Sequence, residues 1–225
     1  MNSTILSTKR LSGSQRELAL NGKLNIVEYD AINIEYLPFE INSDVDCYIF
    51  TSKNAVHSYL EEQKSKVNKG EKSQILKAVC VGEKTKLLLQ KNNFEVLATC
   101  ENAENLSQII ITNYKFYSFL FLSGNLRRTT LPEQLIKNKI DYKEIEVYRT
   151  ILKPKKFKNT FEGILFFSPS GVESFIQDNS LSDSTAFCIG STTMNEAKKY
   201  TNRLIKANKP TIENVIVQAV KHYNS

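Results

Sequence analysis

The sequence predicts an α/β protein made of two similar domains, each a parallel β-sheet flanked by helices. Three observations lead to this fold class. Short apolar runs, typical of buried strands, alternate with segments of helical period. Several motifs occur twice, in the same order. The chain has 225 residues, which is enough for two modest hydrophobic cores.

The repeated motifs indicate an internal duplication. Two pairs are separated by 116 residues and one by 108 residues, so the spacing is nearly constant. This period is far longer than that of a solenoid repeat, and it therefore favours two related domains. The three pairs are "ILSTKR" (5–10) with "FLSGNL" (121–126), "IFTSKNAV" (49–56) with "LFFSPSGV" (165–172), and "AVCVGEKT" (78–85) with "AFCIGSTT" (186–193).

Within each half the elements follow the order strand, polar turn, helix, strand. This alternation predicts parallel sheets covered by helices on both faces. Asn93 and Asn202 follow two of the helices, and we expect both to adopt the left-handed conformation that ends a helix. The expected strands span residues 46–51, 77–81, 94–98, 163–167, 185–189 and 203–207, and the two clearest helices span 83–92 and 193–200.

Two β-prone segments that contain Pro have the character of connectors, and they span residues 29–40 and 144–157. Two domain divisions are compatible with them. A simple division near residue 118 would separate the two copies. Alternatively the chain crosses at the two connectors, and the N-terminal strands then join the C-terminal half in one domain. The residue pattern alone leaves both divisions open.

Composition and charge narrow the class of protein. Hydrophobic residues make up 41% of the chain and charged residues 24%, as in an ordinary globular protein. The net charge of +6 favours an anionic partner, either a nucleic acid or a small polyanion. The first fifteen residues lack the pattern of a signal peptide, and no uncharged apolar stretch is long enough to span a bilayer. We therefore expect a cytoplasmic protein.

The four cysteines predict neither a metal site nor a disulfide framework. None of them forms a CxxC spacing, and none has a histidine nearby in the sequence. Cys80 and Cys188 lie inside apolar strands, where we expect them to be small buried hydrophobic residues.

Short polar motifs follow the predicted strands and lead into helices. Ligands of open parallel sheets bind beyond the carboxyl ends of the strands, and the first N–H groups of a helix favour anions. Each motif alone is also an ordinary helix cap, but five of them together favour a cleft lined for an anion. The motifs are Ser52-Lys53-Asn54, Gly82-Glu83-Lys84-Thr85, Ser123-Gly124-Asn125, Ser168-Pro169-Ser170-Gly171 and Gly190-Ser191-Thr192-Thr193, and Lys9-Arg10 and Arg127-Arg128 lie close to them.

Several kinds of site are excluded by missing motifs. The chain has no GxGxxG, no GxxxxGK[ST] and no GxSxG sequence, which argues against dinucleotide, P-loop and nucleophile-elbow sites.

His57 and His222 have the character of surface or partly buried histidines. Glu144 and Glu146 form no recognisable acid–base pair, and we expect them on solvated strand faces. Aromatic residues do not interleave with basic ones, as a nucleic-acid platform requires.

Six segments of the chain resemble sequence motifs of the uroporphyrinogen-III synthase family. The resemblance is strongest for "GILFFSPSGVESF", "AFCIGSTTMNEAKK" and "ANKPTIENVIVQAV", and "IFTSKNAV", "VGEKTKLLL" and "IEVYRT" extend it over nearly the whole chain. Two features depart from the family pattern. Asn93 and Asn202 stand where the family usually has Gly, and the opening Thr-Arg-Pro of the family is here Thr8-Lys9-Arg10.

The resemblance implies a specific architecture. Members of the family have two α/β domains joined by a two-stranded β-ladder, with a cleft between them, and both ends of the chain belong to one domain. We therefore expect one discontinuous domain, residues 1–36 plus 152–225, and a second domain, residues 37–151.

The resemblance also implies a reaction. The family converts hydroxymethylbilane, a linear tetrapyrrole with eight carboxylates, into uroporphyrinogen III, with loss of water and inversion of the last pyrrole through a spiro intermediate. The family uses no metal or cofactor. We expect a monomer that acts in haem biosynthesis, without nucleic-acid or membrane partners. Tyr148, in "VYRT", is the catalytic candidate, because the Tyr at this motif is the family's candidate for hydrogen bonding to the departing hydroxyl.

The candidate substrate-binding residues come from the polar motifs and the basic residues near them. They are Lys9, Ser52, Asn54, Gly82, Thr85, Ser123, Gly124, Arg128, Ser168, Ser170, Gly171, Gly190, Thr192 and Thr193. The alternative function is that of a catalytically silent, two-lobed binding protein for a small polyanion.

Overall fold

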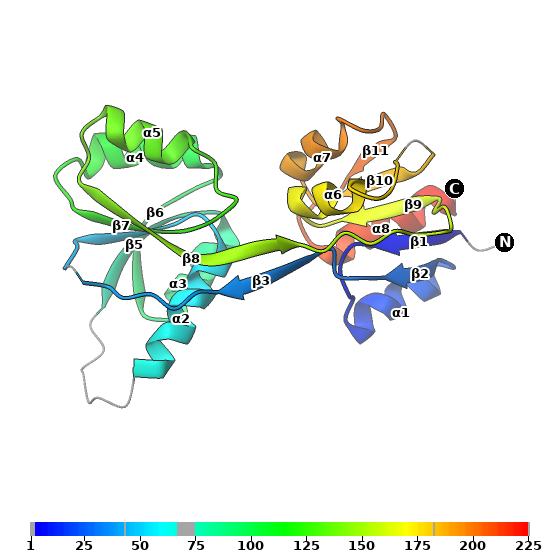
Figure 1. Cartoon of the computed structure of the whole chain (residues 1–225), viewed down its shortest axis with the longest axis horizontal. Helices are drawn as coiled ribbons and strands as arrows, with labels where there is room; N and C mark the ends of the chain where they lie inside the picture. The colour runs from blue at the N-terminus through cyan, green and yellow to red at the C-terminus, as the bar shows by residue number, and fades with distance from the viewer. Residues whose placement is uncertain (1–2, 43, 67–74, 182, 225) are drawn as a thin grey trace. The chain divides into compact units, whose positions relative to one another are not determined.

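The computed structural model divides into two compact units (Figure 1). Unit 1 comprises residues 1–33 and 151–225, and unit 2 comprises residues 34–150. The structure describes residues 3–42, 44–66, 75–181 and 183–224. The family resemblance implied crossings after residues 36 and 151, and the structural division falls after residues 33 and 150.

Unit 1 contains a five-stranded sheet in the order β11-β10-β9-β1-β2, and all its neighbouring strands are parallel. The strands β1 and β2 come from the beginning of the chain, and β9, β10 and β11 come from its end. The elements are β1 (Thr4–Ser7), α1 (Gly13–Asn21), β2 (Asn25–Glu28), β9 (Gly163–Phe166), α6 (Pro169–Ile176), β10 (Thr185–Cys188), α7 (Ser191–Ala197), β11 (Leu204–Lys206) and α8 (Ile212–Tyr223).

Unit 2 contains a six-stranded sheet in the order β3-β8-β7-β4-β5-β6, and the pairs from β8 to β6 are parallel. The elements are β3 (Ile32–Tyr36), β4 (Cys47–Phe50), α2 (Lys53–Lys66), β5 (Leu76–Val81), α3 (Glu83–Gln90), β6 (Phe94–Cys100), α4 (Ala103–Asn113), β7 (Phe119–Gly124), α5 (Thr130–Lys137) and β8 (Tyr142–Leu152).

The strands of the repeated motifs occupy equivalent places in the two sheets, as expected of two related domains. Each pair of repeated motifs falls on equivalent strands: β4 corresponds to β9, β5 to β10, and β7 to β1. In unit 2 the strands β4 to β8 come from one continuous segment of the chain. In unit 1, β1 and β2 come from the N-terminal segment and β9, β10 and β11 from the C-terminal segment. Because β1 pairs directly with β9, a simple division of the chain near residue 118 is wrong.

The buried strands explain why helices cover both faces of each sheet. In β4, Cys47 and Ile49 point to one face, where they pack with residues of α4 and α5. Tyr48 and Phe50 point to the other face and pack with residues of α2 and α3. The same alternation divides the core of unit 1 between α6 and α7 on one face and α1 and α8 on the other. Strands covered on both faces are apolar throughout, as in other parallel sheets.

The strands β3 and β8 carry the chain between the units. They are neighbours in the sheet, and Figure 1 shows that they run in opposite directions. The N–H of Leu37 donates to the carbonyl of Val147 at 3.0 Å within unit 2, and the N–H of Lys153 donates to the carbonyl of Ala31 at 2.8 Å within unit 1. The strand β8 covers most of the second expected connector, 144–157, whereas β3 covers less than half of the first, 29–40.

Helix ends show one correct expectation and one wrong one. Asn93 follows α3 with a φ of 61°, so it is left-handed as expected. Asn202 does not have a positive φ. Among the described non-glycine residues, only Lys23, Asn93 and Lys139 have one. The reason is that α7 already ends at Ala197, and Lys198 closes its last turn with ordinary helical backbone angles.

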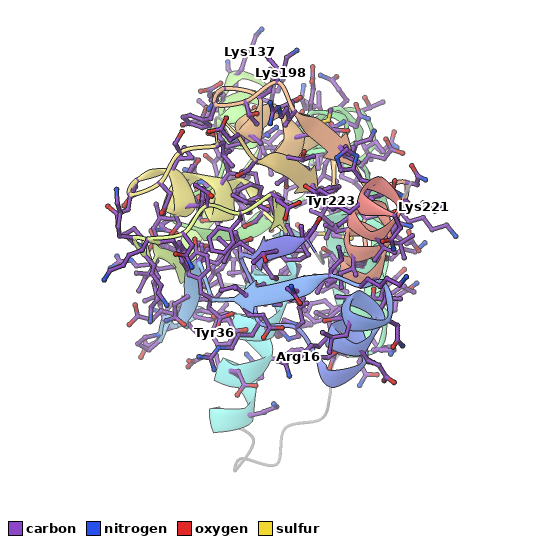
Figure 2. The ribbon with its side chains drawn as sticks, turned by 90° about the vertical axis from the view of Figure 1, so that its right-hand side faces the viewer. Arg16, Tyr36, Lys137, Lys198, Lys221 and Tyr223 are labelled. Atoms are coloured by element: carbon purple, nitrogen blue, oxygen red, sulfur yellow. The ribbon has the colours of Figure 1, made fainter. Side chains whose placement is uncertain are left out.

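The C-terminal helix is anchored to the sheet of unit 1 through Tyr223. Its hydroxyl donates to the carbonyl oxygen of Glu162 at 2.7 Å, just before β9 begins. Figure 2 shows Tyr223 beside the strands, whereas Lys221 of the same helix points outward. Arg16, also labelled in Figure 2, links α1 to β2 through two bonds with the Glu28 carboxylate, of 3.2 and 2.7 Å. Among the described residues, no helix is both long and apolar enough to cross a bilayer.

Candidate functional site

The carboxyl ends of parallel strands meet at one edge of each sheet, and the predicted site residues lie there. In unit 1, the turns after β10, β9 and β1 are adjacent because these strands are neighbours. In unit 2, the same holds for the turns after β5, β4 and β7, with β8 beside them. The unit 1 set is Lys9, Ser168, Ser170, Gly171, Gly190, Thr192 and Thr193, and the unit 2 set is Ser52, Asn54, Gly82, Thr85, Ser123, Gly124, Arg128 and Tyr148.

The Ser-Pro-Ser-Gly turn of unit 1 caps helix α6. The hydroxyl oxygen of Ser168 accepts a hydrogen bond from the N–H of Gly171 at 3.1 Å, and Pro169 begins the helix. The Ser168 and Ser170 hydroxyl oxygens are 3.1 Å apart, so one donates to the other. Each hydroxyl has one O–H group, and the bond between the two serines uses only one of them. The pair can therefore still direct the other O–H toward a ligand.

The turn after β1 packs closely against this cap. The Thr8 hydroxyl donates to the carbonyl oxygen of Leu165 at 2.7 Å and ties β1 to β9. A Cβ on Gly171 would lie 3.5 Å from the Thr8 Oγ1 atom, so the helix start and the β1 turn are in contact. Lys9 follows with an exposed side chain, and its carbonyl oxygen accepts a bond from Ser7 at 2.5 Å.

The Ile-Gly-Ser-Thr-Thr turn places its two threonines differently. Gly190 precedes α7 in extended conformation, with no side-chain cap. The Thr192 side chain is exposed, whereas Thr193 is only 3% exposed and packs inward. In unit 2, Thr85 is likewise only 4% exposed in the first turn of α3. For Thr85 and Thr193, the third residue of each helix therefore faces the sheet.

The turns of unit 2 are held by local hydrogen bonds. The Ser52 hydroxyl oxygen accepts from the N–H of Asn54 at 3.1 Å, just as α2 begins. Gly82 has a φ of +87°, a conformation that favours glycine, and its N–H donates to the carbonyl oxygen of Cys100 at 2.8 Å. Both turns place the N-terminus of a helix at this edge of the sheet, where the helix dipole favours an anion.

Tyr148 lies at the same edge, on β8, next to the end of β7. The Ser52 side chain lies close enough to its hydroxyl to interact with it. Burial raises the pKa of Tyr148, although the interaction with Ser52 partly offsets this effect. The phenol is therefore neutral near pH 7 and can donate a hydrogen bond to a ligand oxygen.

Arg127 and Arg128 have different environments. Arg127 holds the Glu144 carboxylate through two hydrogen bonds, one of them 2.9 Å long from Nη2 to Oε2, and both side chains are at most 30% exposed. Arg128 is exposed. The expectation that Glu144 lies on a solvated strand face is therefore wrong, because Arg127 reaches it across the β7–β8 edge. Because the two residues are 17 positions apart, no local pattern in the sequence predicts this pair.

A surface pocket of about 430 Å³ lies at this edge of unit 2. Its polar lining combines hydroxyl, amide, cationic and carboxylate groups within reach of one another. The lining residues are Ser123, Gly124, Asn125, Arg127, Glu144 and Glu146. In the described ranges, no group of three or more His, Cys, Asp or Glu side chains is arranged to hold a metal ion.

Comparison with known proteins agrees with this arrangement. Residues 15–216 match the family model of uroporphyrinogen-III synthase HemD. The fold is similar to that of uroporphyrinogen-III synthetase from Helicobacter pylori, with 22% identity, coverage of 98% of this chain and 99% of that one, and a TM-score of 0.69. It is also similar to a mutant uroporphyrinogen III synthase from the extremely thermophilic bacterium Thermus thermophilus, with 12% identity, coverage of 98% of each chain, and a TM-score of 0.73.

A search of curated proteins gives no match. The structural similarities, at these identities, concern the fold, whereas the family model covers most of the sequence itself. The chain belongs to the uroporphyrinogen-III synthase family, whose members are cyclising lyases of haem biosynthesis.

Proposed function

We propose that this chain converts hydroxymethylbilane into uroporphyrinogen III, with loss of water and inversion of the last pyrrole ring through a spiro intermediate. Family membership supports the reaction type. The observation in the structure that supports it best is the place of Tyr148, opposite the end of β7 and near Ser52, at a sheet edge rich in hydrogen-bond donors.

The reaction needs positioning more than strong acid–base catalysis. Loss of hydroxide from a pyrrolic carbinol is easy, because the ring nitrogen stabilises the cation that is left behind. Closure without an enzyme gives the product in which no ring is inverted. A catalyst must therefore hold the flexible chain so that the inverting route is faster, which is an effect of proximity and orientation.

The polar turns suit a substrate with eight carboxylates. Hydroxyls and backbone N–H groups at helix starts bind carboxylate oxygens, and a cation such as Arg128 or Lys9 adds charge attraction. In unit 1 we assign this role to the Ser168–Ser170 pair and to the turn at Gly190, with Gly171 allowing close approach. In unit 2 we assign it to the turns at Ser52 and Gly82 and to the end of β7. The net charge of +6 attracts such a substrate over longer distances.

Tyr148 acts on the departing hydroxyl. Its phenol donates a hydrogen bond to the carbinol oxygen as the C–O bond breaks, and the oxygen leaves as water once it has taken up a proton. The raised pKa of Tyr148 keeps the phenol protonated in the neutral range, which this role requires. Tyr148→Phe keeps the ring and removes the donor, so we expect slower turnover with little loss of stability.

The test is an isomer assay on the full chain. Hydroxymethylbilane is made in situ, because it closes by itself, and the oxidised products are separated by chromatography. We expect mostly the type III isomer. Type I product alone, at the rate seen without protein, would favour a silent binding protein and would refute the proposed function.

We further propose that the enzyme is a monomer that acts in the cytoplasm without a nucleic-acid partner. Light scattering coupled to gel filtration should give a mass near the 25.7 kDa of one chain. Cell fractionation should recover the type III activity in the cytoplasmic fraction. A dimer mass, or activity recovered with membranes, would contradict these two assignments.

A further inference from the structure

The ring of Tyr148 occupies the space in which any side chain at position 124 would have to lie. A Cβ built on Gly124 would stand 2.6 Å from the Tyr148 Cε2 atom and 2.7 Å from its Cε1 atom, and closer still to Cζ. Non-bonded carbon atoms prefer about 3.5–4.0 Å. With Tyr148 in this position, residue 124 can therefore only be glycine.

Backbone conformation gives no other reason for a glycine here. Gly82 is the glycine with positive φ among the described residues, and Gly124 lies in the buried strand β7, where it pairs with β8. An L-residue could adopt this backbone. The requirement at position 124 is therefore one of space, and Tyr148 is what fills that space.

A β-bulge brings Tyr148 opposite Gly124. Along the β7–β8 pair, Ser123 pairs with Glu146, but Gly124 pairs with Tyr148, so Val147 is one residue extra on β8. A bulge of this kind re-aims the side chain that follows it. Without it, Val147 would stand opposite Gly124, and Tyr148 would point to the other face of the sheet.

The bulge itself is fixed from the side away from β7. The carbonyl oxygen of Val147 accepts a bond of 2.5 Å from the hydroxyl of Ser58 and a bond of 3.0 Å from the N–H of Leu37. The Val147 side chain is fully buried. Tyr148 is thus held at two points, by its backbone at the bulge and by its ring on Gly124, and its hydroxyl lies near the Ser52 side chain.

We propose that Gly124 is a positioning residue for the reaction, and that it acts by letting the Tyr148 ring lie flat on the end of β7 so that the phenol stays beside Ser52. The inference rests on the proposed role of Tyr148 in the function above. It differs from the binding role that the sequence suggested for Gly124, because a positioning residue affects turnover and a binding residue affects the KM.

The test compares Gly124→Ala with Gly13→Ala in the full chain. A Cβ on Gly13 would meet nothing within 4 Å, so Gly13→Ala is a matched control and should keep wild-type activity. For Gly124→Ala we expect kcat to fall about ten- to hundredfold, since a shift of about 1 Å costs up to about 10²-fold, with little change in KM. Wild-type kcat in Gly124→Ala, or a loss confined to KM, would overturn the inference.

A double variant shows whether Gly124 acts through Tyr148. If it does, Gly124→Ala combined with Tyr148→Phe should be no slower than Tyr148→Phe alone, because the hydroxyl being positioned is already absent. Multiplied losses in the double variant would mean that Gly124 acts independently and would refute the proposal.

A stability cycle covers the case in which Gly124→Ala fails to fold, and it does not depend on activity. We expect Gly124→Ala to lower the unfolding midpoint of the wild type but not that of Tyr148→Ala, because the ring is then gone. An equal loss in both backgrounds would refute the contact. If the wild type forms only the type I isomer while this cycle still shows coupling, the proposed function fails and the contact stands.

Discussion

The hydroxyl of Ser58, in the middle of helix α2, donates a hydrogen bond of 2.5 Å to the carbonyl oxygen of Val147, which lies 89 residues later in strand β8. Ser58 is only 1% exposed. The bond joins the helix that begins at the Ser52 turn to the bulge that sets the direction of Tyr148. One buried contact thus links two parts of the candidate site.

Ser58→Ala should destabilise the fold and slow turnover. Loss of the donor should lower the free energy of unfolding by about 1 kcal/mol, because Leu37 still satisfies one lone pair of the Val147 carbonyl. Urea unfolding measures this change, and the isomer assay measures kcat. His57→Ala, on the exposed side of the same helix, is the control. Equal stability of both variants would show that the bond contributes nothing.

The two functions assigned to Ser168 can be separated by two substitutions. Ser168→Ala removes the cap of α6 and should cost about 0.5–2 kcal/mol of stability. Ser168→Asp keeps a capping oxygen, so the stability should stay near that of the wild type, but its negative charge should repel a substrate carboxylate and raise the KM. An unchanged KM in Ser168→Asp would remove Ser168 from the proposed binding set.

Arg127 and Arg128 should respond differently to replacement by Gln. Arg127→Gln leaves the partly buried Glu144 carboxylate without its cation and should lower the free energy of unfolding by about 1–3 kcal/mol. Arg128→Gln should leave stability unchanged and raise the KM several-fold, and added salt should narrow that difference. The two KM values at low and high salt check this, and the reverse pattern would contradict the assignment.

Stability should fall at alkaline pH because of buried thiols. Burial raises the pKa of both Cys47 and Cys188 from an ordinary value of 9.0 to about 12. The folded state keeps these protons when the unfolded state has lost them. Stability is therefore complete below about pH 9 and decreases as the pH rises toward 12, by up to about 1.4 kcal/mol per pH unit for each thiol.

Urea unfolding between about pH 8 and pH 11 measures this slope, and Cys188→Ala should make it shallower. Buried tyrosines such as Tyr29 and Tyr59, whose pKa values burial also raises, contribute to the remaining slope. The same slope in Cys188→Ala and in the wild type would show that this thiol does not ionise on unfolding in that range.

Much of the fold follows from local patterns in the sequence. The apolar runs at β4, β9 and β10 predict strands covered on both faces, and the repeated motifs predict two related domains. Both follow because burial and helix capping depend on residues close together in the chain. The same reasoning placed Ser168 at a helix start, where the structure has it.

The tertiary structure decided what depends on residues far apart in sequence. The pairing of β1 with β9 excluded the simple division near residue 118, although the residue pattern allowed it. The pairing of Arg127 with Glu144 and the contact of Gly124 with Tyr148 arise from the register of β7 and β8, which a bulge of one residue changes. Sequence alone therefore determined the elements and the donor-rich turns, whereas strand register, which long-range packing sets, decided where their side chains meet.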